Sequence, residues 1–260
     1  MRLTFLGTGT SFGVPVIGCR CRVCTSADPH DRRTRHAALL ENDDRTRRLL
    51  VDAPPELRLQ LVAAGVSSID AVWFTHCHAD HVHGIDDLRA FSARYGRPVS
   101  AYADEACAAT LRDRFDYIFG PELPPVAGVT RPDIRLHVVK PEVTVDIAGF
   151  RILPLSVPHG DQNCLAFRVG DLGYVTDAKD LPGSVRAALA GVRVLVLNAL
   201  WFGDPHPTHL TIEQAIQIAI DIGAESTYLT HLSHRQSHAE ILAALPPGIQ
   251  PAYDGLVVEF

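Results

Sequence analysis

The sequence lacks an apolar run long enough to cross a membrane. Its longest apolar stretch, around residues 192–202, contains Arg193 and Asn198, whereas a membrane-spanning helix needs about 20 consecutive apolar residues. The first residues, Met1–Gly7, form too short an apolar stretch for a secretory signal. We therefore expect a cytoplasmic protein that has no membrane partner.

Positive charge is also in short supply. The chain has 24 lysine and arginine residues against 30 aspartate and glutamate residues, which gives a formal net charge of −6. This balance disfavours a nucleic-acid-binding protein of the basic kind. Because internal repeats, low-complexity segments and linkers are absent, we predict one domain over residues 1–260.

What the sequence does contain is a dense group of metal-ligand side chains. Residues 76–81 read His-Cys-His-Ala-Asp-His and directly follow an apolar run. Successive side chains of a strand alternate between its faces, so His76 and His78 share a face at the end of the predicted strand. Asp80 and His81 lie past that strand and can face a second point. The hexapeptide therefore predicts two metal ions held side by side.

Three more potential ligands occur farther along the chain. His159, Asp177 and His231 each stand at the end of an apolar strand. A rigid sheet can position side chains at its strand ends, which makes these residues candidates to complete a dinuclear site. Imidazole suits zinc and iron, and carboxylate can also hold manganese, so the residue types leave all three metals open.

Strands dominate the apolar pattern, and helices occur in both halves of the chain. Two sheets with helices on their outer faces fit this order. The proline- and glycine-rich segment Phe119–Pro132 predicts a surface loop, either a connector or a lid over the site. We expect helices near residues 54–64, 81–95, 104–115, 182–190, 212–222 and 239–245, and strands near 3–6, 36–41, 47–52, 71–75, 99–103, 134–139, 143–147, 150–157, 164–169, 172–176, 192–197, 227–230 and 256–260.

The pattern His-x-His-x-Asp-His after a buried strand resembles the signature of the metallo-β-lactamase superfamily of metal-dependent hydrolases. The resemblance implies an α+β fold, the αββα sandwich. It also implies that Asp177 bridges two divalent metals, which hold a hydroxide between them as the nucleophile. One metal would be bound by His76, His78 and His159, and the other by Asp80, His81 and His231.

Three of the six cysteines, Cys19, Cys21 and Cys24, lie within six residues. Without a secretory signal, clustered cysteines are more typical of a metal site than of a disulfide framework. A tetrahedral zinc ion would neutralise three thiolates and needs a fourth ligand; reduced, unliganded thiols are the alternative. We expect the remaining cysteines to be small packed apolar residues, namely Cys77, Cys107 and Cys164.

Several segments resemble the phosphoribosyl 1,2-cyclic phosphate phosphodiesterases of the bacterial carbon–phosphorus lyase pathway. They are the glycine-rich start at 7–15, the cysteine cluster, Thr230-His-Leu-Ser-His234 and Tyr253-Asp-Gly255. The resemblance implies that His234 completes a structural zinc site with the three cysteines. It also implies a small-molecule substrate, either a cyclic phosphate or a nucleotide-like phosphodiester, with 5-phosphoribosyl 1,2-cyclic phosphate as one candidate.

The loop before the helix at 212–222 contains a candidate for substrate contact. The resembled family places a substrate-contacting histidine at a position similar to that of His209, where it would bind a phosphate oxygen or protonate the leaving alkoxide. His206 is the competing candidate, and a polar residue near the start of the helix is the alternative role for His209. We count the metal ligand Asp80 and His209 as catalytic. The other histidines are interpreted as structural or solvent-exposed, namely His30, His36, His83, His137 and His238.

Other functions fit parts of the sequence. A tRNA 3′-processing endonuclease of the ribonuclease Z type shares the hexapeptide, but the net acidity and the cysteine cluster disfavour it and any nucleic-acid partner. A thioesterase or lactonase of the same fold is a second alternative, and a non-catalytic metal-binding protein a third. Arg32, Arg33 and Arg35 either meet a phosphate or form a solvated charge run. The sequence leaves a monomer and a homodimer open.

Overall fold

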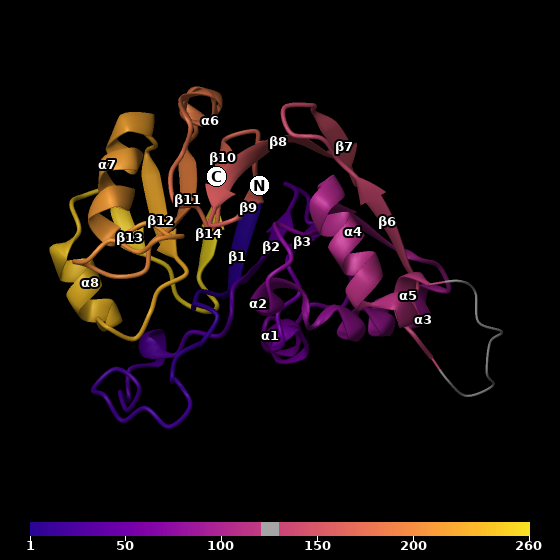
Figure 1. The fold of residues 1–260 in the computed structure, drawn as a ribbon, viewed down its shortest axis with the longest axis horizontal. Coiled ribbons are helices and arrows are strands. Elements are labelled where there is room, and N and C mark those ends of the chain that lie inside the picture. The colour runs from indigo at the N-terminus through magenta and orange to yellow at the C-terminus, as the bar shows by residue number, and fades with distance from the viewer. Residues whose placement is uncertain (121–129) are drawn as a thin grey trace.

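The computed structural model describes residues 1–120 and 130–260, which form two seven-stranded sheets (Figure 1). The first sheet has the order β14-β1-β2-β3-β4-β5-β6. Its strands from β3 to β6 run parallel, and the others pair antiparallel. The strands of this sheet are β1 (Arg2–Gly7), β2 (Ala37–Glu41), β3 (Arg48–Val51), β4 (Ala71–Trp73), β5 (Val99–Ala103), β6 (Ile134–Val138) and β14 (Val257–Glu259).

The second sheet has the order β13-β12-β11-β10-β9-β8-β7. Its strands from β10 to β13 run parallel, so their carboxyl ends meet at one edge. The strands are β7 (Val145–Ile147), β8 (Phe150–His159), β9 (Gln162–Val169), β10 (Leu172–Val175), β11 (Val194–Asn198), β12 (Ser226–Thr230) and β13 (Ile249–Pro251).

Helices cover the outer faces of both sheets, and apolar side chains of the two inner faces pack against each other (Figure 1). This arrangement confirms the predicted α+β fold, the αββα sandwich. The first sheet is accompanied by α1 (Leu57–Ala63), α2 (Ala79–Val82), α3 (Arg89–Tyr95), α4 (Glu105–Arg114) and α5 (Asp116–Phe119), and the second by α6 (Gly183–Leu189), α7 (Ile212–Ile222) and α8 (His238–Ala244).

Two aromatic residues show how the sheets are joined. Trp73 on β4 packs edge-on against Phe167 on β9, with 5.5 Å between ring centroids. The Trp73 indole donates a 3.0 Å hydrogen bond to the carbonyl of Leu165 on the same strand of the second sheet. Because the ring is fully buried, this bond satisfies a donor that would otherwise be costly. The contact fixes the sheet spacing directly behind the metal-ligand loop.

The structure corrects two predicted boundaries beside that loop. β4 ends at Trp73, before the histidines, because the amide of Thr75 donates to the side chain of Asp52 (2.8 Å) and not to a neighbouring strand. His76 and His78 therefore lie on a loop, and His78 is the N-cap residue of α2. The single helix predicted over 81–95 is instead α2, a 3-10 turn and α3 in succession.

Two further predictions concern the segments 119–132 and 212–222. The predicted surface loop at 119–132 falls largely outside the described residues, since 121–129 are not part of the description. The helix predicted at 212–222 is present as α7. Thr211 and Gln214 form a reciprocal capping box at its start, and Gly223 ends it in the left-handed conformation. None of the helices in residues 1–120 and 130–260 has the length and apolar character of a membrane span.

Candidate metal centre

The predicted ligands meet at the edge where strands of both sheets end. The loop between β4 and α2 supplies His76 and His78, α2 itself supplies Asp80 and His81, and β8 of the second sheet ends at His159. Asp177 and His231 follow β10 and β12, whose carboxyl ends lie at one edge because both strands run parallel to β11. Strand ends of the two sheets thus converge on one point.

Four of these side chains form a first ligand group: His76, His78, His159 and Asp177. Their potential ligand atoms all lie within 4.8 Å of one another. His78 Nδ1 is 3.0 Å from His76 Nε2 and 3.1 Å from His159 Nε2. Three imidazole nitrogens that face one another at this spacing suit a shared cation between them.

A second ligand group consists of Asp80, His81, His231 and, again, Asp177. Oδ1 of Asp177 lies 3.3 Å from His231 Nε2, and Oδ2 lies 3.4 Å from His81 Nε2. Oδ2 is also 3.6 Å from His76 Nε2 in the first group. The carboxylate of Asp177 therefore stands between the two groups.

Unpartnered nitrogen atoms test whether these residues fit a metal. Nε2 of His81 and both ring nitrogens of His231 are buried and have no hydrogen-bond partner among the described residues. Leaving such an atom unsatisfied costs about 1–3 kcal/mol. A metal ion would satisfy Nε2 of each ring. The orphaned nitrogens thus fit a metal site.

The charges of Asp177 and His76 match the protonation states that metal binding needs, whereas His81 would have to release a proton to bind a metal. Burial would raise the pKa of Asp177, but the nearby His231 and His81 hold that pKa well below its ordinary value. Burial and the neighbouring His81 lower the pKa of His76, which leaves it neutral. For His81, burial is outweighed by Asp177, Asp80 and Asp52, which raise its pKa. Ionised carboxylates and neutral imidazoles are the ligand forms of these side chains.

Backbone conformation sets three residues of the site apart. Asp52, Asp177 and His231 have φ values of 62°, 50° and 61°, in the left-handed region that non-glycine residues rarely adopt. Each of the three residues follows the carboxyl end of a strand, at the edge of the sheet that faces the site. Outliers of this kind gather at functional sites, where the surrounding structure imposes them.

Asp52 is a site residue that the sequence analysis missed. It is fully buried, and its Oδ2 lies 2.6 Å from His81 Nδ1. It also accepts hydrogen bonds from the amide and the hydroxyl of Thr75, both at 2.8 Å. A carboxylate on the far nitrogen orients a metal-binding imidazole. The signal was present, since Asp52 follows the apolar strand β3 just as Asp177 follows β10.

His209 lies beside the two ligand groups. Its Nε2 is 3.4 Å from Asp177 Oδ2, and its ring stacks on His231 with 4.8 Å between centroids. His206 lies farther out, 3.2 Å from the opposite nitrogen of His209. Burial lowers the pKa of His209, while Asp177 opposes that shift. Of the two candidates, His209 is the one that reaches the centre.

The cysteine cluster forms a separate group. Nδ1 of His234 lies 3.5 Å from Cys19 Sγ, 3.4 Å from Cys21 Sγ and 3.5 Å from Cys24 Sγ. Tetrahedral zinc, with bonds of about 2.3 Å to sulfur and about 2.0–2.1 Å to nitrogen, separates these atoms by about 3.6 Å. A hydrogen bond from the Cys24 amide, together with His234, lowers the pKa of Cys21 to about 6. The donor set and spacing fit zinc.

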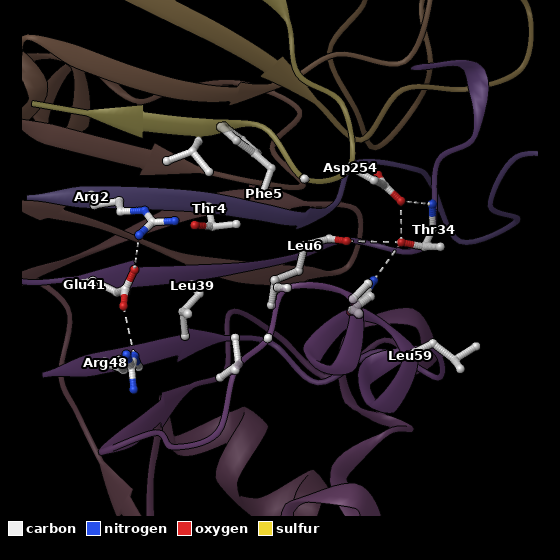
Figure 2. Close-up of a pocket in the computed structure, with 17 residues that line it drawn as sticks. Arg2, Thr4, Phe5, Leu6, Thr34, Leu39, Glu41, Arg48, Leu59 and Asp254 are labelled. Carbon is white, nitrogen blue, oxygen red and sulfur yellow. Dashed lines mark hydrogen bonds and ion pairs between the residues drawn. The ribbon is translucent and has the colours of Figure 1, made fainter. Parts of the chain in front are cut away.

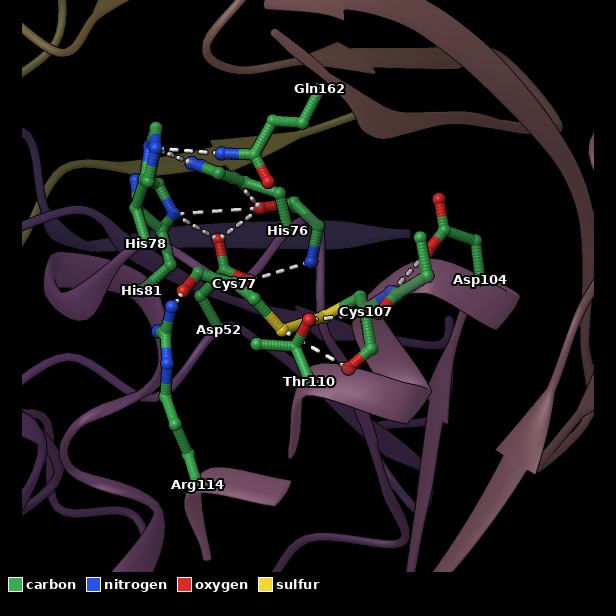
Figure 3. Close-up of a disulfide and its surroundings, with 12 residues drawn as sticks. Asp52, His76, Cys77, His78, His81, Asp104, Cys107, Thr110, Arg114 and Gln162 are labelled. Carbon is green, nitrogen blue, oxygen red and sulfur yellow. Dashed lines mark hydrogen bonds and ion pairs between the residues drawn. A yellow bond between two sulfur atoms is a disulfide. The ribbon is translucent and has the colours of Figure 1, made fainter. Parts of the chain in front are cut away.

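The structure overturns the expectation that Cys77 and Cys107 are unpaired. They form a disulfide, as Figure 3 shows, and their Cα atoms lie 5.4 Å apart. The bond joins the metal-ligand loop to α4, and Arg114 of that helix donates to the carbonyl of Cys77. Both cysteines are as buried as predicted. A pairing across 30 residues has no signal in sequence spacing alone. Cys164 is a buried free thiol.

The arginine cluster is mostly used within the fold. Arg33 is fully buried, pairs with Asp31 and donates to the carbonyl of Gln236. Arg35 pairs with Glu56. Of the three, only Arg32 is exposed. The interpretation as a solvated charge therefore fits Arg32 alone. Arg33 and Arg35 are paired within the fold and do not fit the role of a phosphate contact.

A cavity of about 590 Å³ lies away from the metal-ligand groups, on the first sheet beside α1 (Figure 2). Glu41 bridges Arg2 and Arg48 along one side of it. On the other side, Asp254 accepts hydrogen bonds from the amide and hydroxyl of Thr34 at 2.7 and 2.6 Å. These groups are largely paired with one another, and the cavity contains none of the predicted ligands.

Comparison with known proteins agrees with the geometry. Residues 47–232 match the family model described as a beta-lactamase superfamily domain, and the chain therefore belongs to that superfamily of metal-binding hydrolases. A crystal structure described as a new diphosphatase from the PhnP family is 38% identical, with a TM-score of 0.90, and the match covers 100% of this chain and 97% of that one. Within the superfamily, this protein is a PhnP-like hydrolase, which confirms the resemblance noted above.

Two curated relatives are only partly covered. The octanoyltransferase of Porphyromonas gingivalis is 42% identical over 257 residues, which make up 98% of this chain and 51% of that protein. Coenzyme PQQ synthesis protein B of Methylorubrum extorquens is 34% identical over 172 residues, or 61% of this chain and 52% of that protein. The chain thus spans about half the length of these curated relatives.

Proposed function

We propose that this protein is a phosphodiesterase that uses two divalent metal ions to hydrolyse a small cyclic phosphate or a nucleotide-like phosphodiester. The leading candidate substrate is 5-phosphoribosyl 1,2-cyclic phosphate. The observation that carries the proposal is the position of Asp177: its Oδ2 lies 3.6 Å from His76 of the first ligand group and 3.4 Å from His81 of the second. A carboxylate in this position suits a site that would hold two divalent metal ions.

The side chains divide the work around the scissile phosphate. His76, His78 and His159 would hold one metal and Asp80, His81 and His231 the other, with Asp177 between them. When bound, the two metals supply an activated water and offset the negative charge that builds on the phosphate. Asp52 keeps the ring of His81 in its orientation through the 2.6 Å contact.

His209 would act on the substrate itself. Its imidazole faces Asp177 through Nε2 and is held from behind by the hydroxyl of Thr208, 2.8 Å from Nδ1. A ring fixed in this way can orient a phosphate oxygen or hand a proton to the leaving alkoxide. The diphosphatase activity named for the 38%-identical relative supports the same reaction class, because a diphosphate also breaks at a phosphorus–oxygen bond.

Hydrolysis assays on metal-reconstituted protein test the proposal. The substrates are bis(p-nitrophenyl) phosphate and ribose 1,2-cyclic phosphate, Asp177→Ala is the inactive variant, and Asp171→Ala, at an exposed carboxylate, is the matched control. We expect turnover of both substrates, abolished in Asp177→Ala and retained in the control. Turnover of the first substrate alone keeps the chemistry and reopens the identity of the substrate. Turnover of neither, with metals bound, contradicts the proposal and directs attention to thioesters and lactones.

A further inference from the structure

A small cavity opens next to the metal-ligand groups and is the place where a substrate would extend. It has a volume of about 260 Å³, and both His209 and His231 contribute to its wall. Phe12, an exposed aromatic of the glycine-rich loop, lines it from one segment, and Trp201 and Arg235 line it from two others. This volume lies just below the range of about 300–1,000 Å³ that is usual for ligand pockets, so it suits a small substituent.

The guanidinium of Arg235 lies over an aromatic ring in this cavity. Its guanidinium carbon lies 3.7 Å from the centroid of the Trp201 ring. The ring is itself fixed, because its indole nitrogen donates a 2.9 Å hydrogen bond to the carbonyl of Asp204. Stacking uses the face of a guanidinium and leaves the donors at its edge available to an anion.

The charge of Arg235 has no acidic partner in the described part of the chain. No carboxylate oxygen of residues 1–120 or 130–260 lies within 4.0 Å of its guanidinium. Some other arginines in the fold are paired: Arg48 lies 2.9 Å from Glu41, and Arg186 lies 2.8 Å from Asp221. An unneutralised cation on a fixed aromatic ring, in a cavity that adjoins the metal centre, is suited to binding a phosphate.

We propose that Arg235 binds a second anionic group of the substrate, beyond the phosphate that undergoes hydrolysis. The preferred substrates are then small phosphodiesters that carry a further phosphate, and simple diesters are poor ones. This inference rests on the proposed phosphodiesterase function. It makes Arg235 a specificity-determining residue and Trp201 the residue that positions it, while His209 and the metal ligands perform the chemistry.

A matched pair of chromogenic substrates tests the inference. p-Nitrophenyl ethyl phosphate and p-nitrophenyl 2-phosphoethyl phosphate release the same leaving group and differ only in the terminal phosphate. We expect kcat/KM of the wild type to be about tenfold higher for the phosphorylated substrate. Arg235→Gln should remove this preference through KM and leave the simple diester unchanged. Arg235→Lys, which keeps the charge, should restore part of it.

Controls separate this inference from a structural role and from the proposed function. Arg32→Gln, at another exposed arginine, should keep the preference. Equal losses on both substrates in Arg235→Gln, or no preference in the wild type, overturn the inference while phosphodiesterase activity stands. If the wild type hydrolyses no diester, the proposed function has failed. A measurement that needs no activity then tests whether Arg235 binds an anion.

That measurement is a sulfate titration followed by tryptophan fluorescence. The chain has two tryptophans, and Trp73 is fully buried between the sheets. Trp201 lies against Arg235, so a change in fluorescence when an anion binds at Arg235 comes from Trp201. We expect a saturable change in the wild type and in Arg32→Gln, and its loss in Arg235→Gln. The same titration curve in wild type and Arg235→Gln would overturn the inference.

Discussion

Asp177 is the side chain on which both ligand groups depend. Asp177→Asn removes its charge but keeps its size and its tolerance of a left-handed backbone, which Asn shares. We expect the variant to fold and to lose more metal affinity than the about 10–100-fold loss typical of residues that only orient a ligand. Metal content measured by mass spectrometry after dialysis checks this. Full retention of two metals per chain would exclude a bridging role for the carboxylate.

Asp52 should affect the metals indirectly. In Asp52→Asn, Nδ1 of His81 loses its 2.6 Å carboxylate partner but keeps a polar neighbour. We expect metal affinity or kcat to fall by about 10–100-fold. Competition with a fluorescent chelator measures the affinity, and Asp44→Asn, at a fully exposed turn residue, is the matched control. Unchanged affinity in Asp52→Asn would show that His81 is oriented by the backbone alone.

At the scale of single residues, the sequence was informative where a motif is contiguous. The hexapeptide contains four side chains that the structure brings together. A position at the end of an apolar strand indicated the other three, His159, Asp177 and His231. Asp52 also follows the end of an apolar strand, but its partner His81 is 29 residues away, so the sequence does not connect the two. Spacing along a chain does not report which strand ends become neighbours in space.

The loop that contains the cysteine cluster is an element with its own proposed metal. Cys21→Ser should remove one zinc ion per chain and leave the ions of the metal centre in place, since no cysteine of the cluster belongs to either ligand group. We expect the melting temperature to fall by at least about 5 °C. Metal analysis and calorimetry check both effects, with Cys164→Ser as control at the buried free thiol. An unchanged zinc content would favour reduced, unliganded thiols.

The disulfide between the metal-ligand loop and α4 can be counted chemically. Denatured, metal-free protein should show four reactive thiols, and six after reduction, because four of the six cysteines are free. A closed loop of this length contributes about 2–4 kcal/mol to the free energy of unfolding. Cys107→Ala should therefore unfold at lower denaturant concentration than the oxidised wild type. Six thiols without reduction would show that the pair is not bonded.

Element boundaries were less predictable than element types. The apolar run before His76 continues through Thr75, yet β4 ends at Trp73 because the side chain of Asp52 takes the Thr75 amide. Such a bond depends on a residue from another strand, so local periodicity does not report it. In contrast, the start and end of α7 follow from Thr211 and Gly223, which act within one turn of the helix and are readable locally.

At the scale of the whole molecule, the metal centre joins the two sheets. The loop after β4 belongs to the first sheet, and Asp177 and His231 to the second. Removal of the metals leaves buried carboxylates near one another, among them Asp80 and Asp177. A ligand present at 100 times its dissociation constant stabilises a protein by about 2.7 kcal/mol. We expect a chelator to lower the melting temperature of the wild type and to have a smaller effect on Asp177→Asn, as scanning calorimetry would show.

The layered fold was predictable from the order of strands and helices, but the pairing of the first strand with the last was not. The amino group of Met1 lies 2.5 Å from the carbonyl of Phe260, and β1 pairs with β14. A few glycine and serine residues could join these ends. The exposed turn between β2 and β3 could then be cut to give new termini. Such a circular permutant should keep its metal-ligand loops intact, because they lie on neither the joined ends nor the severed hairpin.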